Sequence, residues 1–196
     1  MIVLQEMKVG NLRSNLMIKK YNPNDKYKNL FYVAESLLAL HKSNFVHGDF
    51  HSGNLLLYDQ RYIYISDFGL SKPVDKLGVL DKTYGVLPYV APEVLRGNPY
   101  IKASDIYSFG IIMWEMTSGI PAFNKRSHDF DLTLDICRGL RPNIIEGTMP
   151  EYVELMKKCW DPDPNKRPNA EKLVESFNKW QIEYPVSQNR IPVPGK

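Results

Sequence analysis

The chain has 196 residues, of which 43% are hydrophobic and 24% charged, so it suits one domain with a core and is too apolar for an intrinsically disordered protein. Its formal net charge of +3 is too small to indicate nucleic acid or anionic lipid as a partner. The apolar residues 1–4 are followed at once by Gln5 and Glu6, which makes them too short for a signal peptide or a membrane span. We therefore expect a cytoplasmic protein, with the nucleus as a second location, that binds neither nucleic acid nor membrane.

The two cysteines, Cys137 and Cys159, lie far apart in the sequence. Neither belongs to a CxxC pair or to a Cys/His spacing that is typical of zinc ligands. The sequence therefore predicts ordinary, partly buried thiols and gives no support to a disulfide framework or a zinc finger.

The N-terminal residues predict short elements. Residues 4–7 are expected to end a strand, and Gly10 and Asn11 are expected to form a turn. That turn would open a short helix over residues 12–16.

A longer helix and a hairpin are predicted next. Asn24 or Asp25 can cap a helix that runs to about His41, because apolar residues recur at helical spacing. Residues 55–58 and 62–65 are two short β-type runs separated by polar residues, which predicts a β-hairpin.

The second half of the chain predicts mostly helices. Residues 67–88 lose any period, and they are expected to form a long loop, which is uncommon unless it is functional. Apolar residues from Ile106 to Met116 predict a buried helix that ends near Gly119. Residues 182–196, with three prolines from Pro185 onward, are expected to be a disordered tail. Further helices are predicted over residues 129–138, 151–160 and 169–181.

The stretch "FVHGDFHSGNLLLY", residues 45–58, raises the question of its chemistry. His47 and His51 stand four residues apart, as helical zinc ligands do, but the neighbouring Gly48 and Gly53 disfavour the helix that such ligands need. Zinc is therefore the weaker interpretation. A simple polar turn between buried segments is a further alternative.

Asp49 and Asn54 in this stretch, together with Asp67 after the hairpin, suggest a different chemistry. Their carboxylate and amide oxygens are hard ligands of the kind that hold Mg²⁺ against phosphate groups. The hairpin between the two segments would bring them to one place.

The sequence resembles the C-terminal lobe of eukaryotic protein kinases over residues 1–181. Each motif alone is a weak signal, but their order and spacing are typical of the family. The resemblance implies a kinase-like α+β fold, with a mainly α-helical lobe and a small β-hairpin at the catalytic cleft. The matching segments are the catalytic loop at residues 47–54, Asp67-Phe68-Gly69, Ala91-Pro92-Glu93, Asp105 in "SDIYSFGIIMWEM", and Arg167 in "CWDPDPNKRP".

The resemblance also implies roles for the residues of the catalytic cleft. Asp49 would accept the proton of the substrate hydroxyl, and Asn54 and Asp67 would hold the Mg²⁺ that accompanies ATP. His51 would lie beside the transferred phosphate, at the place of a lysine in serine/threonine kinases. We expect His47 to be a structural residue packed beneath Phe68 and Gly69.

Other residues are implied to bind the nucleotide or to support the fold. Leu4 falls at the gatekeeper position, and the hinge from Gln5 to Met7 would hydrogen-bond the adenine edge. Leu56 would lie under the adenine ring, although an ordinary place in the strand core is nearly as well supported. Glu93 and Arg167 would form a buried ion pair, and Asp105 would be structural.

The sequence departs from the family in its upstream parts. It contains no GxGxxG phosphate loop, and it lacks the ATP-anchoring lysine and its glutamate partner. We therefore predict that the 196 residues, as a fragment of a kinase, transfer phosphate poorly. The alternative is a pseudokinase-like scaffold whose exposed cleft is covered by a protein partner.

The catalytic segment departs from the family as well. Gly48 replaces the arginine that pairs with a phosphorylated activation loop, the non-RD pattern, so phosphorylation of Ser71, Thr83 or Tyr84 would lack its usual partner. Val86 replaces a threonine that contacts the catalytic-loop lysine. The segment "GVLPYVAPE" favours serine/threonine specificity within the tyrosine-kinase-like group, with protein substrates.

Overall fold

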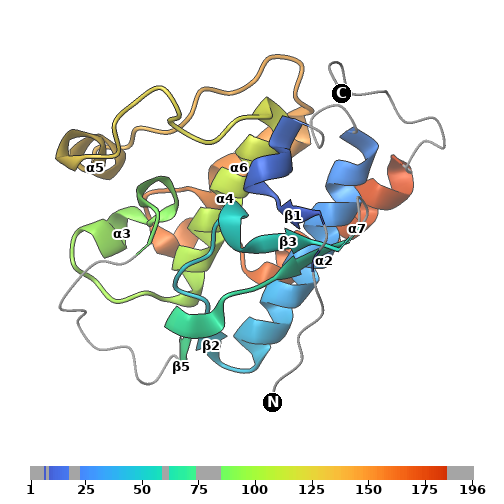
Figure 1. The fold of residues 1–196 in the computed structure, drawn as a ribbon, viewed down its shortest axis with the longest axis horizontal. Coiled ribbons are helices and arrows are strands. Elements are labelled where there is room, and N and C mark those ends of the chain that lie inside the picture. Colours follow the sequence, from blue (N-terminus) through green and yellow to red (C-terminus); the bar gives the residue numbers. More distant parts are fainter. Residues whose placement is uncertain (1–6, 8, 18–22, 59–61, 74–84, 185–196) are drawn as a thin grey trace.

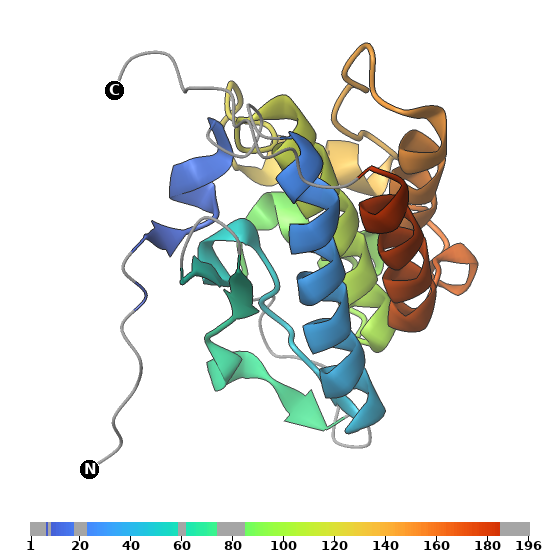
Figure 2. The same ribbon diagram turned by 90° about the vertical axis from the view of Figure 1, so that its right-hand side faces the viewer.

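Helices make up most of the described residues (Figure 1), and two small antiparallel sheets lie along one side of them (Figure 2). The computed structural model describes residues 7, 9–17, 23–58, 62–73 and 85–184. No helix in these ranges is long and apolar enough to cross a membrane. The helices are α2 (Pro23–Lys42), α3 (Pro92–Leu95), α4 (Lys102–Ser118), α5 (Phe130–Cys137), α6 (Pro150–Cys159) and α7 (Ala170–Glu183).

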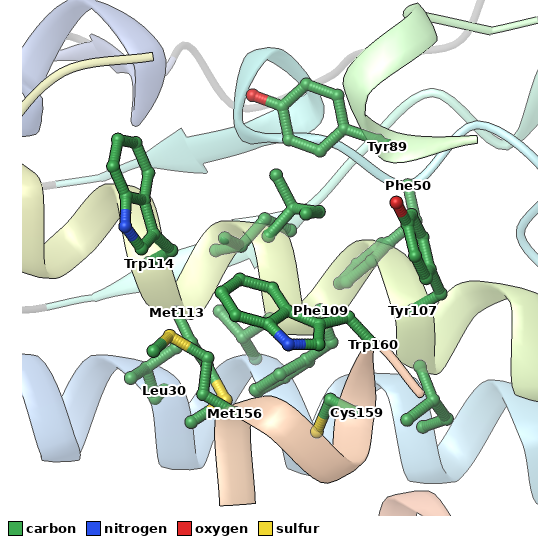
Figure 3. Close-up of a cluster of buried hydrophobic side chains, with 14 of the residues drawn as sticks. Leu30, Phe50, Tyr89, Tyr107, Phe109, Met113, Trp114, Met156, Cys159 and Trp160 are labelled. Atoms are coloured by element: carbon green, nitrogen blue, oxygen red, sulfur yellow. The ribbon is translucent and has the colours of Figure 1, made fainter. Parts of the chain in front are cut away.

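Helix α4 is the centre of the core. It is buried on nearly all sides, as a helix surrounded by protein is, and it ends where Gly119 adopts a left-handed conformation. Its side chains Phe109 and Met113 pack among residues of neighbouring elements, including Phe50 and Met156 (Figure 3).

A glycine lets α4 and α6 approach closely. A Cβ atom at Gly110 would lie 2.8 Å from the Cβ of Cys159 and 3.3 Å from the carbonyl oxygen of Met156. Both cysteines are free thiols, as predicted. Cys137 is partly buried, as expected, but Cys159 is fully buried because it packs against α4 at Gly110.

Helix α2 lies between α7 and the strands (Figure 2). Its Tyr27 joins an aromatic cluster with Tyr152 of α6 and with Phe177 and Trp180 of α7, whose neighbouring ring centroids are 5.4–6.3 Å apart. Aromatic rings at such separations bury a large apolar area and add favourable ring contacts.

The sheets are short and fix the segments that carry the polar motifs. One sheet has the order β1 (Gly10–Asn11), β3 (Leu55–Leu57) and β4 (Ile63–Ile65), and Leu55 pairs with Ile65 in the hairpin. The second sheet pairs β2 (Phe45–Val46) with β5 (Lys72–Pro73).

The fold class and the long elements agree with the sequence predictions. The kinase-like α+β arrangement, the hairpin and the five helices predicted after residue 20 are confirmed, as is a short 3-10 helix (Arg13–Asn15) between the buried Leu12 and Leu16. Helix α7 continues to Glu183, so residues 182 and 183 are helical and not part of a disordered tail. Residues 185–196 lie outside the described residues.

Three local predictions were wrong. Gly10 and Asn11 form a strand and not a turn, because their backbone pairs with β3; the turn lies just before them, where Gly10 N–H donates to Met7 O. Helix α2 begins at Pro23, so Asn24 and Asp25 lie in its first turn; proline suits that first position because it has no N–H to satisfy.

The third error concerns residues 67–88, which are not one irregular loop. The segment contains a 3-10 helix (Phe68–Leu70), strand β5 and a second 3-10 helix (Leu87–Tyr89). Strand β5 depends on pairing with the distant β2, which local periodicity cannot reveal. Residues 74–84, including the candidate phosphorylation sites Thr83 and Tyr84, lie outside the described residues.

Candidate active site

The β3–β4 hairpin brings two polar segments together. Asn54 directly precedes β3 and Ser66 directly follows β4. The backbone N–H and the hydroxyl of Ser66 both donate to the carbonyl oxygen of Asn54, each at 2.9 Å. Asp67, the next residue, is therefore tied to the Asn54 segment. Its backbone is left-handed, with φ of 59°, and its carboxylate accepts a bond from Gly69 N–H at 3.3 Å.

Asp49 and Asn54 are hydrogen-bonded to each other. The amide nitrogen of Asn54 donates to the Asp49 carbonyl oxygen at 3.0 Å and to Asp49 Oδ2 at 3.2 Å. Both bonds use the amide nitrogen, so the amide oxygen is the atom of Asn54 that can ligate a cation.

A buried carboxylate on α4 anchors the catalytic loop. Asp105 accepts bonds from the backbone N–H groups of His47, at 2.8 Å, and Gly48, at 3.1 Å. His41 of α2 also lies 2.9 Å from this carboxylate through Nε2. The sequence implies a structural role for Asp105, but it indicates His41 only as the approximate end of its helix and assigns it no role. The feature of the sequence that could have identified His41 is a polar residue at a core-facing position of the predicted helix.

His47 is fully buried beneath the Asp67-Phe68-Gly69 turn. Its Nδ1 accepts a bond from Asp49 N–H at 3.3 Å, so Nε2 carries the proton and donates to Ser66 O at 3.1 Å. Its ring centroid lies 5.3 Å from that of Phe68. His47 thus connects the catalytic loop to the segment that carries Asp67.

His51 lies next to Asp49 but is not a cation. Its Nδ1 accepts a bond from Gly53 N–H at 3.0 Å, and its Nε2 is 3.5 Å from Asp49 Oδ1. Burial lowers the pKa of His51, and the Asp49 carboxylate only partly opposes this effect, so the imidazole is neutral at pH 7. Because His47 and His51 both direct Nδ1 at backbone N–H groups, the geometry gives no support to the zinc interpretation.

Gly48 occupies a position that favours glycine. Its φ is +77°, and a Cβ atom would lie 3.2 Å from the carbonyl oxygen of Leu70. The replacement of arginine by glycine therefore agrees with the local backbone.

Glu93 and Arg167 form the expected buried ion pair. Two guanidinium nitrogens of Arg167 donate to the two carboxylate oxygens of Glu93, each at 2.7 Å, and Ser104 donates a third bond at 3.0 Å. Burial opposes ionisation, but the bonds and charge of Arg167 hold the pKa of Glu93 below its usual value. This pair fixes the Ala91-Pro92-Glu93 segment against the segment that precedes α7.

The structure reveals a polar chain that the sequence analysis missed. The hydroxyls of Ser52 and Tyr89 lie 2.7 Å apart, Tyr89 donates to Glu115 at 2.7 Å, and Ala122 N–H donates to the same Glu115 oxygen at 2.9 Å. Burial raises the pKa of both Tyr89 and Glu115. Glu115 could have been suspected as the one carboxylate inside "IIMWEM".

The residues that are expected to bind the nucleotide are only partly described. Leu4 and Gln5 lie outside the described residues. Met7 is half-buried and belongs to no strand, and Leu56 is half-buried opposite Tyr64 in the hairpin. Two aromatic side chains in this region are exposed: Tyr64 of the hairpin is 45% exposed, and Phe68 in the turn after it is 51% exposed.

Comparisons with known proteins identify the family of the chain. A family model described as protein tyrosine and serine/threonine kinase matches residues 1–177. The chain belongs to the protein kinase family.

Its relatives include three proteins named as serine/threonine kinases. The chain is 36% identical over 156 residues to a probable kinase of Dictyostelium discoideum, which covers 73% of the chain and 18% of that protein. It is 32% identical over 179 residues to a putative kinase/receptor of Acanthamoeba polyphaga mimivirus, and this match covers 90% of the chain and 11% of that protein. For an Arabidopsis thaliana kinase the values are 31% over 147 residues, with 75% and 26% covered. The chain thus spans about a quarter or less of the length of these relatives.

Proposed function

We propose that Asp49, Asn54 and Asp67 form the lower half of an ATP-dependent protein kinase site that transfers the γ-phosphate to serine or threonine hydroxyls of proteins. The observation that carries this proposal is the bonded set of Asp49, Asn54 and Ser66, which brings the candidate base and both candidate metal ligands to one end of the hairpin. The names of the relatives support serine/threonine specificity.

Asp49 is the candidate base in this site. It is held by Asn54 through both its carbonyl oxygen and Oδ2. Its side chain is 18% exposed, so a substrate hydroxyl can reach it. A base positioned in this way contributes on the order of 10²–10⁴ in rate.

The residues present fit magnesium. Asn54 offers an amide oxygen and Asp67 a carboxylate, and Mg²⁺ in kinases is held by one or two such protein oxygens together with phosphate oxygens. A Mg²⁺ held by Asn54 and Asp67 would supply positive charge that neutralises the charge developing in phosphate transfer. The chain's own part is to hold the two ligands through the Ser66–Asn54 bonds and the left-handed Asp67 backbone.

Phosphate transfer by these 196 residues is proposed to be weak. The sequence has no GxGxxG loop, and the lysine–glutamate pair that the reaction needs has no counterpart in it. The second candidate function, a non-catalytic scaffold, is favoured by the exposed Tyr64, Phe68 and Leu70, which a protein partner could cover.

Nucleotide binding tests the proposal directly. Calorimetric titration of the chain with ATP should show binding that requires Mg²⁺, and Asp67→Asn should weaken it at least about tenfold, a loss of about 1.4 kcal/mol. Asp131→Asn, at an exposed position on α5, is the control and should bind as the wild type does. Absence of binding, or binding that ignores Mg²⁺ and Asp67, would favour the scaffold.

A further inference from the structure

We propose that His51 is a positioning residue for Asp49: its neutral imidazole donates the Nε2 proton toward one carboxylate oxygen while Asn54 holds the other. The inference depends on the proposed function of Asp49 and adds to it a role for the residue that replaces the family's lysine. A lysine at this place supplies positive charge, whereas this neutral histidine orients the Asp49 carboxylate through its N–H group.

The direction of the imidazole is set by its hydrogen bond to the backbone. His51 caps the 3-10 helix Ser52–Asn54, and its Nδ1 accepts the Gly53 N–H at 3.0 Å. A nitrogen that accepts a bond cannot carry a proton, so the ring proton lies on Nε2. Gly53 makes the close approach possible, because a Cβ atom there would lie 2.8 Å from both Nδ1 and Cε1 of the ring.

The protonated nitrogen faces the candidate base. Nε2 lies 3.5 Å from Asp49 Oδ1, while the amide nitrogen of Asn54 lies 3.2 Å from Oδ2. The first distance is longer than an ordinary hydrogen bond, but hydrogen bonds in active sites commonly shorten once substrate is bound. Each carboxylate oxygen thus has a donor beside it, and rotation of the carboxylate is restricted from both sides.

A third contact holds the imidazole in place. The ring of Tyr89 lies 5.6 Å from the His51 ring, and Tyr89 is itself fixed by its bonds to Ser52 and Glu115. The side chain of His51 is only 13% exposed. The polar chain that begins at Ser52 therefore supports the positioning of Asp49 through the Tyr89 ring.

Ring-nitrogen NMR of the ¹⁵N-histidine-labelled chain at pH 7 tests this inference without nucleotide. The His51 signals, assigned by their loss in His51→Asn, should show a bare Nδ1 and a protonated Nε2. Asp49→Asn should shift the Nε2 signal, whereas Asp67→Asn, which removes a carboxylate that His51 does not contact, should leave it unchanged. The exposed His128 provides an internal reference.

Two substitutions separate positioning from capping. His51→Asn retains an acceptor near Nδ1 for Gly53 N–H but loses the donor to Asp49, and His51→Gln places a donor near Nε2. The side-chain amide signals of Asn54 should therefore shift and broaden in His51→Asn and return toward wild type in His51→Gln. Variants that alter only the cap would show the opposite order.

A proton on Nδ1, a doubly protonated ring, or an Nε2 signal insensitive to Asp49→Asn would overturn the inference, and the first two need no substitution at Asp49. Because these signals do not depend on nucleotide, a chain that fails to bind Mg²⁺ and ATP but shows this tautomer would refute the proposed function and leave the His51 geometry standing.

Discussion

The helical base and the face that carries the candidate site are built in different ways. In the base, α2, α4, α6 and α7 bury large side chains completely and bring aromatic rings together. On the site face, Tyr64 and Phe68 are about half exposed, and polar side chains hold the loops. The comparison indicates that packing in the base supplies most of the stability, and that the site face is stabilised by its contacts with the base.

A few charged side chains connect the site face to the base. Asp105 reaches from α4 to the backbone of His47 and Gly48, and Arg167 reaches from the segment that precedes α7 to Glu93. These bonds place the catalytic loop and the Ala91-Pro92-Glu93 segment on the rigid base. Substitutions in the base and at these charged side chains can therefore distinguish the contribution of packing from that of anchoring.

The largest effect is expected from one phenylalanine of the base. Phe109 is fully buried and lies against Phe50 and Phe177, so Phe109→Ala should lower the free energy of unfolding by about 3–5 kcal/mol. Phe68→Ala, the same change at a residue 51% exposed, should cost less than about 1 kcal/mol. Urea denaturation measures both. Equal losses would mean that the two regions are not built differently.

Removal of one partner of the buried ion pair should come next. Arg167→Met strands the Glu93 carboxylate and should cost about 3 kcal/mol, the lower end for a buried pair, because Glu93 keeps its bond from Ser104. The exposed Lys172 pairs with Glu175, and Lys172→Met should change stability by less than about 1 kcal/mol. A loss of similar size in both variants would argue against an anchoring role for Arg167.

The catalytic-loop anchor should show a smaller loss. Asp105→Asn keeps the shape of the side chain but turns an NH₂ group toward backbone donors, which should cost about 2 kcal/mol in urea denaturation. Asp129→Asn is the matched control, because asparagine caps α5 as well as aspartate does, and it should be nearly neutral. A neutral Asp105→Asn would mean that the loop is held by other contacts.

The sequence predicted the base better than the face, for a physical reason. For helices α2, α4, α6 and α7, apolar residues recur at helical spacing within the local sequence. For the hairpin, the polar residues between two β-type runs mark the turn. Strands β1 and β5 form by pairing with residues 26 or more positions away in the sequence, so no local pattern marks them. The contacts of Tyr89 with Ser52 and Glu115 join three distant segments, and only the fold brings them together.

The smallest expected effect concerns a charge inside the base. Lys26 is buried, with Nζ 4.5 Å from the centroid of the Tyr152 ring, and burial lowers its pKa to about 8 from the usual 10.5. Above pH 8 the folded chain gives up this proton while the unfolded chain still holds it. Stability should therefore rise with pH in this window, by on the order of 1–2 kcal/mol between pH 8 and 10.

Substitution of Lys26 isolates this contribution. Lys26→Met removes the buried charge, so it should be more stable than the wild type at pH 7, and its advantage should shrink as the pH approaches 10. Lys172→Met, at an exposed position on α7, should keep the wild-type dependence. The measurement is urea denaturation at steps from pH 7 to pH 10. Should the difference between Lys26→Met and wild type stay constant over this range, the lysine would be ionised in the folded chain throughout, and its contact with the Tyr152 ring would have to offset the cost of burial.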